Sequence, residues 1–421
     1  MEKSLKNQQT AARPNYTIPL VAMVIIFFIF GGLTALNSNV LTPYAKNTFG
    51  LTPGQSQIVN FAFFIAYFVM SLPASTLISK IGYKLSVVVG LAVVAAGSLS
   101  YLLAVNMAST SVFLIATFIV AAGIAILQTA ANPYLAKLGD PSGASMRITI
   151  AGALNSLATY IAPTLGGAFI LNAALNTTQQ GENLRLTYIF LTILVALITV
   201  IIFFSKLPEI VDETTEEVKE AEAKSVKGPF SFRNLRFGVL GIFCYVGAEV
   251  GVASFIVFYM TETIGGFSAE IGAKFAAYYW LMAMIGRFVG VPILKTVASE
   301  KALLVAAVIN IGLIAGSILI SNDITVSMFG MNVPVIILML ILVGLFNSVM
   351  WGCIFALGVD GLGIHTTRAS GFMMMAVAGG AIMPYIQGLL SDAVGIKLAY
   401  IIPLLCYAYL AYFAINGHKK A

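Results

Sequence analysis

Charged residues are scarce in this chain: Asp, Glu, Lys and Arg make up 10% of the 421 residues, whereas 59% are hydrophobic. A soluble domain carries about 25% charged residues, because most of its surface contacts water. The few charges here lie almost entirely between long apolar runs, which is typical of a chain whose main solvent is the bilayer. This composition excludes an ordinary soluble fold.

Residues that build catalytic and metal sites are also few. The three cysteines, Cys244, Cys353 and Cys406, lie within apolar runs, and the only histidines are His365 and His418. The sequence has no phosphate-cradling P-loop, no metal-ligand spacing and no Ser-His-Asp arrangement. We therefore predict neither an enzyme nor an ATP-driven pump, and no resident cofactor, metal or disulfide framework.

Apolar runs long enough to cross a bilayer are abundant. A transmembrane helix needs about 20 mostly apolar residues, and a helix is favoured in hydrocarbon because it satisfies its own backbone hydrogen bonds. Twelve runs meet this requirement: 18–40, 56–79, 85–107, 111–136, 148–172, 186–206, 237–261, 271–294, 301–321, 333–358, 369–390 and 397–416. The predicted fold class is therefore an all-α integral membrane protein with twelve transmembrane helices.

The distribution of basic residues predicts the orientation of these helices. If the N-terminus is cytoplasmic, 19 of the 23 Lys and Arg residues fall inside, and only Lys46, Arg185, Lys274 and Lys397 fall outside. The positive-inside rule then places both termini in the cytoplasm. The first 17 residues are polar and carry no cleavage site, so we expect the first run to be a retained helix. This bias also explains the net charge of +6 without a nucleic-acid partner.

The longest polar segment divides the chain into two halves of six runs each. The predicted organisation is a tail at 1–17, a bundle at 18–206, a cytoplasmic linker at 207–236, a second bundle at 237–416 and a tail at 417–421. The linker changes from acidic to basic along its length and is interpreted as a solvated connector.

A repeated spacing suggests that the two halves are copies of one another. Arg147 precedes Pro163 by 16 residues in the fifth run, and Arg368 precedes Pro384 by the same number in the eleventh. Weak internal symmetry of this kind is typical of transporters built from repeats, which bind substrate between the repeats near the midplane.

Polar residues inside the runs are mostly amides. An unpaired polar group in hydrocarbon is costly, so each should face a partner, water or a ligand. Amides both donate and accept hydrogen bonds, which suits a sugar hydroxyl, whereas an anionic solute would call for buried Arg or Lys that the runs lack. Any single amide can instead join two helices. The candidate substrate-binding residues are Asn37, Asn39, Asn60, Gln128, Asn132, Asn155, Asn347 and Gln387, with Trp351 as a stacking aromatic.

One carboxylate stands apart from the other acids. Glu249 lies near the middle of the seventh run, where burial disfavours the charged form, so it is the candidate to carry a coupling proton or to bind sodium. The alternative is a carboxylate held by neighbouring hydroxyls or amides, with no part in coupling. Three arginines near cytoplasmic ends are predicted to make gating or structural contacts: Arg147, Arg287 and Arg368.

Several stretches of the chain carry a family likeness. They are Phe28-Ile29-Phe30-Gly31, Leu36-Asn37-Ser38, Leu127-Gln128-Thr129-Ala130-Ala131-Asn132-Pro133-Tyr134, Asn155-Ser156, Tyr245 to Glu249, Gly286-Arg287-Phe288, and Gly379-Gly380 through Pro384 and Gln387. In these stretches the chain resembles the major facilitator superfamily, and within it the fucose / glucose-galactose / N-acetylglucosamine symporter family. The resemblance implies two six-helix bundles with pseudo-two-fold symmetry, alternating access driven by an ion gradient, and a bacterial inner-membrane location.

The departures from the fucose–proton symporters of that family concern acidic residues. Those proteins carry an Asp where this chain has Ser38, a Glu at Gln128, and glutamines at Gly152 and Glu249. The resemblance is therefore to the glucose/galactose and N-acetylglucosamine branch. It implies a monomer that imports a hexose or amino-hexose with a sodium ion or proton. The rivals are an uncoupled facilitator, an exporter of amphipathic compounds and a non-transporting sugar receptor.

Overall fold

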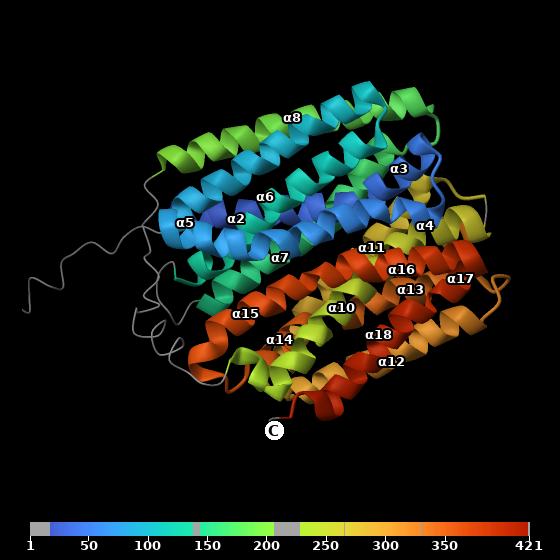
Figure 1. Cartoon of the computed structure of the whole chain (residues 1–421). Helices are drawn as coiled ribbons and strands as arrows, with labels where there is room; N and C mark the ends of the chain where they lie inside the picture. The colour runs from blue at the N-terminus through green and yellow to red at the C-terminus, as the bar shows by residue number, and fades with distance from the viewer. Residues whose placement is uncertain (1–16, 138–143, 206–227, 265, 329, 420–421) are drawn as a thin grey trace, which may run out of the picture.

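The computed structural model describes residues 17–137, 144–205, 228–264, 266–328 and 330–419, and these fold almost entirely into helices (Figure 1). In the first half the elements are α2 (Thr17–Leu36), the π-helical turn η1 (Asn37–Leu41), α3 (Thr42–Phe49), α4 (Pro53–Ser56), α5 (Ile58–Met107), α6 (Thr110–Lys137), α7 (Ala144–Ile170) and α8 (Thr177–Phe204). In the second half they are η3 (Pro229–Ser231), α10 (Arg233–Phe258), η4 (Tyr259–Ile264), α11 (Ala269–Ile293), α12 (Ser299–Leu319), β1 (Thr325–Met328), β2 (Met331–Pro334), α13 (Val335–Asn347), α14 (Met350–Val359), η5 (Gly363–His365), α15 (Thr366–Met375), η6 (Ala376–Ala378), α16 (Gly379–Val394), α17 (Ile396–Ala399), α18 (Ile401–Tyr412) and η7 (Phe413–Gly417).

The number of membrane-spanning helices agrees with the twelve predicted runs. In the part of the chain that the structure describes, nine helical stretches are long and apolar enough to cross a bilayer. One of them, Pro53–Met107, is 55 residues long and contains the second and third runs. Gly82 divides it, because φ is 77° there, a conformation that glycine adopts without strain. Helices α7 and α11, of 27 and 25 residues, complete the set.

The helices form two bundles that lie against each other. Figure 1 shows α2 to α8 in the upper part of the molecule and α10 to α18 mainly below them. The bundles meet where α7 packs on α11 and where α5 packs on α16. The α7–α11 contact joins the fifth and eighth spans, and the α5–α16 contact joins the second and eleventh. A pseudo-two-fold axis that relates the halves therefore exchanges these two contacts.

Several local details differ from the sequence-based prediction. The first run continues past residue 40 into α3, and the tenth is broken after Asn347 into α13 and α14. The hairpin β1–β2, in which Thr325 pairs with Pro334, was not predicted, because β1 lies between the ninth and tenth runs and β2 overlaps the start of the tenth. Helix α10 begins at Arg233, inside the predicted linker 207–236. Residues 206–227 of that linker lie outside the described residues, so the domain boundaries stay a prediction.

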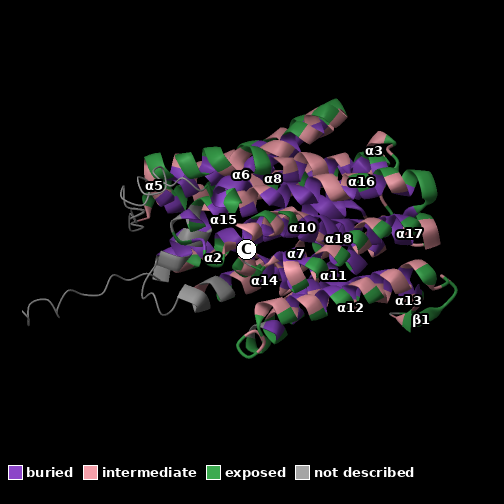
Figure 2. Ribbon diagram, turned by 60° about the horizontal axis from the view of Figure 1, so that its bottom comes forward, coloured by how far each residue is buried: buried purple, intermediate pink, exposed green. Residues whose placement is uncertain are grey.

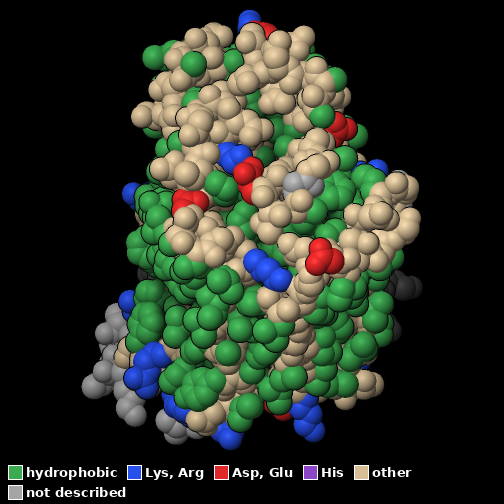
Figure 3. All heavy atoms as spheres, turned by 90° about the vertical axis from the view of Figure 1, so that its right-hand side faces the viewer, with side chains coloured by type: hydrophobic (Ala, Val, Ile, Leu, Met, Phe, Trp, Pro, Cys, Tyr) green, Lys and Arg blue, Asp and Glu red, His purple; other side chains and the backbone are tan. Residues whose placement is uncertain are grey.

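The outer surface has the character expected for contact with lipid. Along α8 the side chains of Phe190, Ile193, Leu197 and Phe204 point away from the protein and are 55–78% exposed. In Figure 3 a broad hydrophobic surface covers the lower half of the molecule, and basic side chains gather along its lower edge. Buried residues lie where helices face one another (Figure 2), most continuously along α10. Exposed apolar area on this scale fits a bilayer and not water.

Helix packing relies locally on glycine. Gly123 of α6 lies directly against the backbone of Gly90 and Val94 in α5, and a β-carbon at that position would overlap them. Small residues of this kind let transmembrane helices approach closely, since lipid provides no hydrophobic driving force for association.

Candidate functional site: a cavity between the bundles

The two ends of the molecule differ in how the bundles meet. We call them the Gly50 end, which carries the loops around Gly50, 171–176, 266–268 and the β1–β2 hairpin, and the Gly82 end, which carries the Gly82 bend and residues 295–298 and 360–365. The helices run between these ends (Figure 1).

Polar contacts join the bundles at the Gly50 end. Lys46 Nζ and Glu262 Oε1 form a salt bridge of 2.6 Å. Asp392 of α16 accepts hydrogen bonds from Thr52 Oγ1 at 2.5 Å and from the Gly54 amide at 3.1 Å. Gly54 also lies against the Gly388 carbonyl, leaving no room for a side chain. We call the contacts of Lys46, Thr52 and Gly54 with the second bundle the Gly50 latch.

A cavity of about 1960 Å³ lies between the bundles on the other side of this latch. Its inner part is lined by residues in the middle of the helices, among them Thr34, Tyr67 and Gln128, and it extends to exposed residues at the Gly82 end, among them Lys80 and Arg368. The bundles are thus closed at one end and separated at the other. This is the arrangement of a carrier whose central site faces one side of the membrane.

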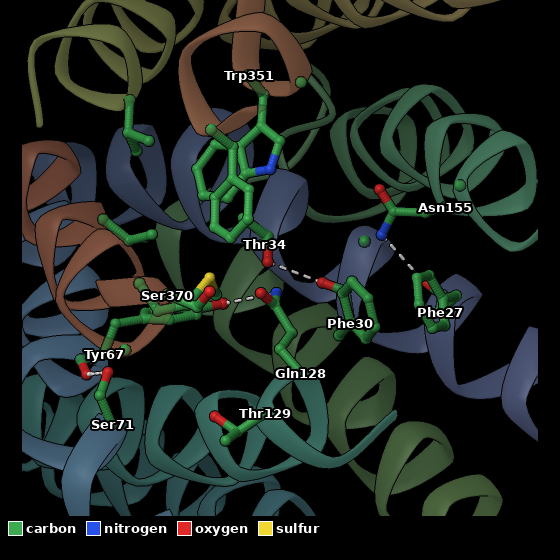
Figure 4. A pocket seen from close by; sticks show the side chains of 18 of the residues that line it. Phe27, Phe30, Thr34, Tyr67, Ser71, Gln128, Thr129, Asn155, Trp351 and Ser370 are labelled. Atoms are coloured by element: carbon green, nitrogen blue, oxygen red, sulfur yellow. Dashed lines mark hydrogen bonds between the residues drawn. The ribbon is translucent and has the colours of Figure 1, made fainter. Parts of the chain in front are cut away.

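Two predicted amides and the predicted aromatic line this cavity. Gln128 Nε2 donates to Tyr67 Oη at 3.0 Å, and Asn155 Nδ2 donates to the Phe27 carbonyl at 2.9 Å. Figure 4 shows both side chains within the pocket, with Trp351 on its opposite wall. Both residues line the pocket, and a carboxamide can donate to and accept from a solute hydroxyl there.

Aromatic rings make up much of the remaining wall. Phe27 and Phe30 lie with ring centroids 4.8 Å apart. Trp351 stacks on Phe355 at 6.5 Å and meets the edge of Tyr245 at 6.2 Å. A site with apolar faces and a few polar groups suits a ring that has both C–H faces and hydroxyl edges.

Other predicted amides lie outside the cavity in this conformation. Asn347 is fully buried in the second bundle, where its Oδ1 accepts from Asn310 at 2.9 Å and from Tyr407 at 3.0 Å, while its Nδ2 donates to Tyr279 at 2.6 Å. It joins helices rather than facing the cavity. Asn37, Asn39, Asn60 and Gln387 are also buried and do not line the cavity. The side chain of Asn132 lies outside the described residues.

Glu249 of α10 lies in the cavity wall. Tyr245, one helical turn earlier in α10, donates its hydroxyl to Glu249 Oε1 at 2.6 Å. The same hydroxyl lies 3.3 Å from the Asn347 carbonyl, which orients it. Among the described residues that line the cavity, Glu249 is the only acid.

Arg287 makes a polar contact between the bundles. It lies six residues before the end of α11 at the Gly82 end and is partly buried. Its guanidinium lines the cavity and donates through Nη1 to Ser156 Oγ of the other bundle. Arg147 instead contacts the Leu135 carbonyl at 3.1 Å, whereas Arg368 lines the mouth of the cavity.

Sequence reasoning missed several residues of the site. Tyr67, Ser71 and Ser156 all contribute polar atoms to the cavity or to its interbundle contacts. Serine and tyrosine are common in transmembrane helices, so their presence alone does not indicate a site. They could have been identified only by knowing that their helices turn them toward the same region as Gln128 and Asn155.

Comparison with known proteins agrees with this geometry. A model of the Major Facilitator Superfamily matches residues 22–384. The glucose/galactose transporter of Brucella abortus (strain 2308) is 39% identical over 417 residues, which are 98% of this chain and 97% of that relative. The L-fucose-proton symporter of Escherichia coli (strain K12) is 30% identical over 422 residues, 95% of this chain and 93% of the relative. A crystal structure of the E. coli fucose:proton symporter covers 96% of this chain and 99% of that chain with 27% identity and a TM-score of 0.68.

The fold and its one-sided cavity therefore define a multi-pass membrane transporter and not an enzyme. The chain belongs to the major facilitator superfamily, in its fucose / glucose-galactose / N-acetylglucosamine symporter family. The family and fold class predicted from the sequence are confirmed.

Proposed function

We propose that this protein imports a neutral hexose or amino-hexose by alternating access, coupled to a sodium or proton gradient through Glu249. The observation that carries the proposal is the cavity itself, with Gln128 and Asn155 on one side, Trp351 on the other and Glu249 in the wall. The names of the curated relatives, which are glucose/galactose and fucose transporters, support the sugar class.

The orientation that we propose places the Gly82 end in the cytoplasm of a bacterium, with the chain in the inner membrane and acting as a monomer. Lys80, Lys84 and Arg368 lie at that end, in agreement with the positive-inside rule. The described conformation is then open to the cytoplasm, and the Gly50 latch closes the outer side.

Coupling requires that the ion and the sugar favour the same conformational step. Glu249 shares the cavity with the proposed sugar site, so its charge state can affect both the solute and Arg287. A bound proton or sodium ion would neutralise the acid and change the electrostatic balance next to the Arg287–Ser156 contact between the bundles. Glu249 is thus positioned to link ion binding to bundle movement.

Uptake of radiolabelled glucose, galactose and N-acetylglucosamine into proteoliposomes tests the proposal. Three conditions are compared: a sodium gradient, a proton gradient and neither. We expect one gradient to drive accumulation in the wild type and in Glu182→Gln, a control that removes a surface acid of α8. Glu249→Gln should lose accumulation but retain sugar exchange. Uptake that only equilibrates in the wild type would instead identify a facilitator.

A further inference from the structure

A second group of polar side chains lies between the bundles, toward the Gly50 end. Asn37 Nδ2 donates to Asn60 Oδ1 at 3.1 Å, and Asn60 Nδ2 donates to Gln57 Oε1 at 2.8 Å. Across the interface, Ser254 Oγ of α10 lies 3.5 Å from Gln57 Oε1. Gln387 of α16 lies against Gly251, one turn from Ser254. We call these five residues the interbundle amide cluster.

The cluster is buried but incompletely paired. Asn37, Gln57 and Gln387 are at most 1% exposed, yet Asn37 Oδ1, Gln57 Nε2 and Gln387 Nε2 have no hydrogen-bond partner among the described residues. In the same π-helical turn as Asn37, Asn39 is fully buried and unpaired at both ends of its amide, so flipping the amide does not change this. A buried unsatisfied group costs about 1–3 kcal/mol, and such groups in a native protein call for an explanation.

The position of the cluster suggests when these atoms find partners. Gln57 is three residues from Gly54, and Gln387 is five residues from Asp392, so the cluster lies directly behind the Gly50 latch. Its members come from both bundles. Separation of the bundles at the Gly50 end would break the Ser254–Gln57 contact and expose the unpaired atoms to the solution on that side.

The chemistry of the unpaired atoms indicates the class of ligand. A bound cation needs acceptor oxygens and is repelled by amide N–H groups. Here both kinds of atom are unpaired: donors on Gln57 and Gln387, and an acceptor on Asn37. A sugar hydroxyl donates and accepts at once, so a polyhydroxylated solute matches the set and a sodium ion does not.

The structure assigns to the interbundle amide cluster the role of an outer docking site for sugar hydroxyls, used when the Gly50 end is open. This inference rests on the proposed function and adds a second site to it, separate from Gln128 and Asn155 in the described cavity. Sugar would bind first at the cluster and pass to the central cavity as the latch closes.

Half-saturation measured separately on each side of the membrane tests this assignment. Influx and efflux of the transported hexose are measured in oriented proteoliposomes for the wild type, Gln387→Leu and the control Gln180→Leu, which lies on α8 at the same end. We expect Gln387→Leu to raise the outer half-saturation concentration roughly tenfold, the equivalent of one lost hydrogen-bonding group, and to leave the inner value within about twofold. The control should change neither.

Equal changes in the outer and inner half-saturation concentrations, or no change in either, would overturn the assignment. The cluster would then be a hydrated contact that closes the interface between the bundles. Absence of sugar flux in the wild type would overturn the proposed function as well, so the two failures are distinguishable. If Gln387→Leu does not fold, as judged by thermal unfolding in detergent, Ser254→Ala is measured in its place, with a smaller rise expected on the outer side only.

Discussion

Removal of the Asp392 carboxylate should open the Gly50 end. In Asp392→Ala, the Thr52 hydroxyl and the Gly54 amide both lose their acceptor, and with it their charge-assisted hydrogen bonds to α16. A hydrogen bond to a charged group is worth about 1.5–3 kcal/mol when protected from solvent. Asp392 is exposed, so we reduce the loss to roughly 1–2 kcal/mol for the residue. That corresponds to a shift of roughly five- to thirtyfold toward the state open at the Gly50 end.

Alkylation of an introduced cysteine measures this shift. Ser254 is fully buried behind the latch, so the labelling rate of Ser254→Cys by a maleimide is proportional to the fraction of molecules open at that end. The native cysteines Cys244, Cys353 and Cys406 are buried and give little background. We expect labelling to rise roughly five- to thirtyfold when Asp392→Ala is added.

A matched control separates this effect from a general loss of stability. Glu182→Gln removes a surface pair within α8, in which Arg185 lies 3.4 Å from Glu182, and breaks no contact between the bundles. It should leave the labelling rate unchanged. Labelling that does not respond to Asp392→Ala, or that responds equally to Glu182→Gln, would show that the latch does not hold the bundles together.

The other predictions concern the latch, the cavity and the core. Glu262→Gln should raise the same labelling rate by less than about fivefold, because an exposed ion pair contributes ~1 kcal/mol or less, and salt should reduce the difference. Gly54→Leu should stop sugar transport but preserve binding from outside, measured as above, since a side chain there overlaps the backbone of α16. Gln128→Leu should raise the inner half-saturation concentration roughly fivefold or more through the loss of a hydrogen-bonding group, without changing the outer value. Asn347→Ala should lower the unfolding temperature in detergent, because three side chains lose a buried partner at a cost of about 1 kcal/mol or more each, whereas a folded variant should keep wild-type sugar half-saturation.

The helix count followed from the sequence because hydrocarbon thickness sets the length of an apolar run. The break at Gly82 also agreed with the sequence, which places polar residues between the second and third runs. Boundaries were less well predicted where a helix extends into water, as α8 does from Thr177. There the Asn176 cap decides where the helix begins, and hydropathy does not.

The side chains of the site were harder to predict than the helices. Asn155 and Asn347 are both amides within an apolar run, but Asn155 borders the cavity, whereas Asn347 links its own helix to three others. Which of these occurs depends on the rotation of each helix within its bundle, and hydropathy does not reveal that rotation when most residues on every face of the helix are apolar. Arg287 shows the same limit, since its helix position is apparent from sequence but its contact with Ser156 is a tertiary one.

Movement of ions driven by sugar tests the proposed coupling most directly. A sugar gradient is imposed across proteoliposomes that contain no ion gradient, and the sodium and proton concentrations inside are followed with indicators. The account predicts that sugar entry carries one of these ions with it in the wild type, and that Glu249→Gln exchanges sugar without ion movement. Sugar entry without either ion in the wild type, or ion movement that persists in Glu249→Gln, would contradict the role proposed for Glu249.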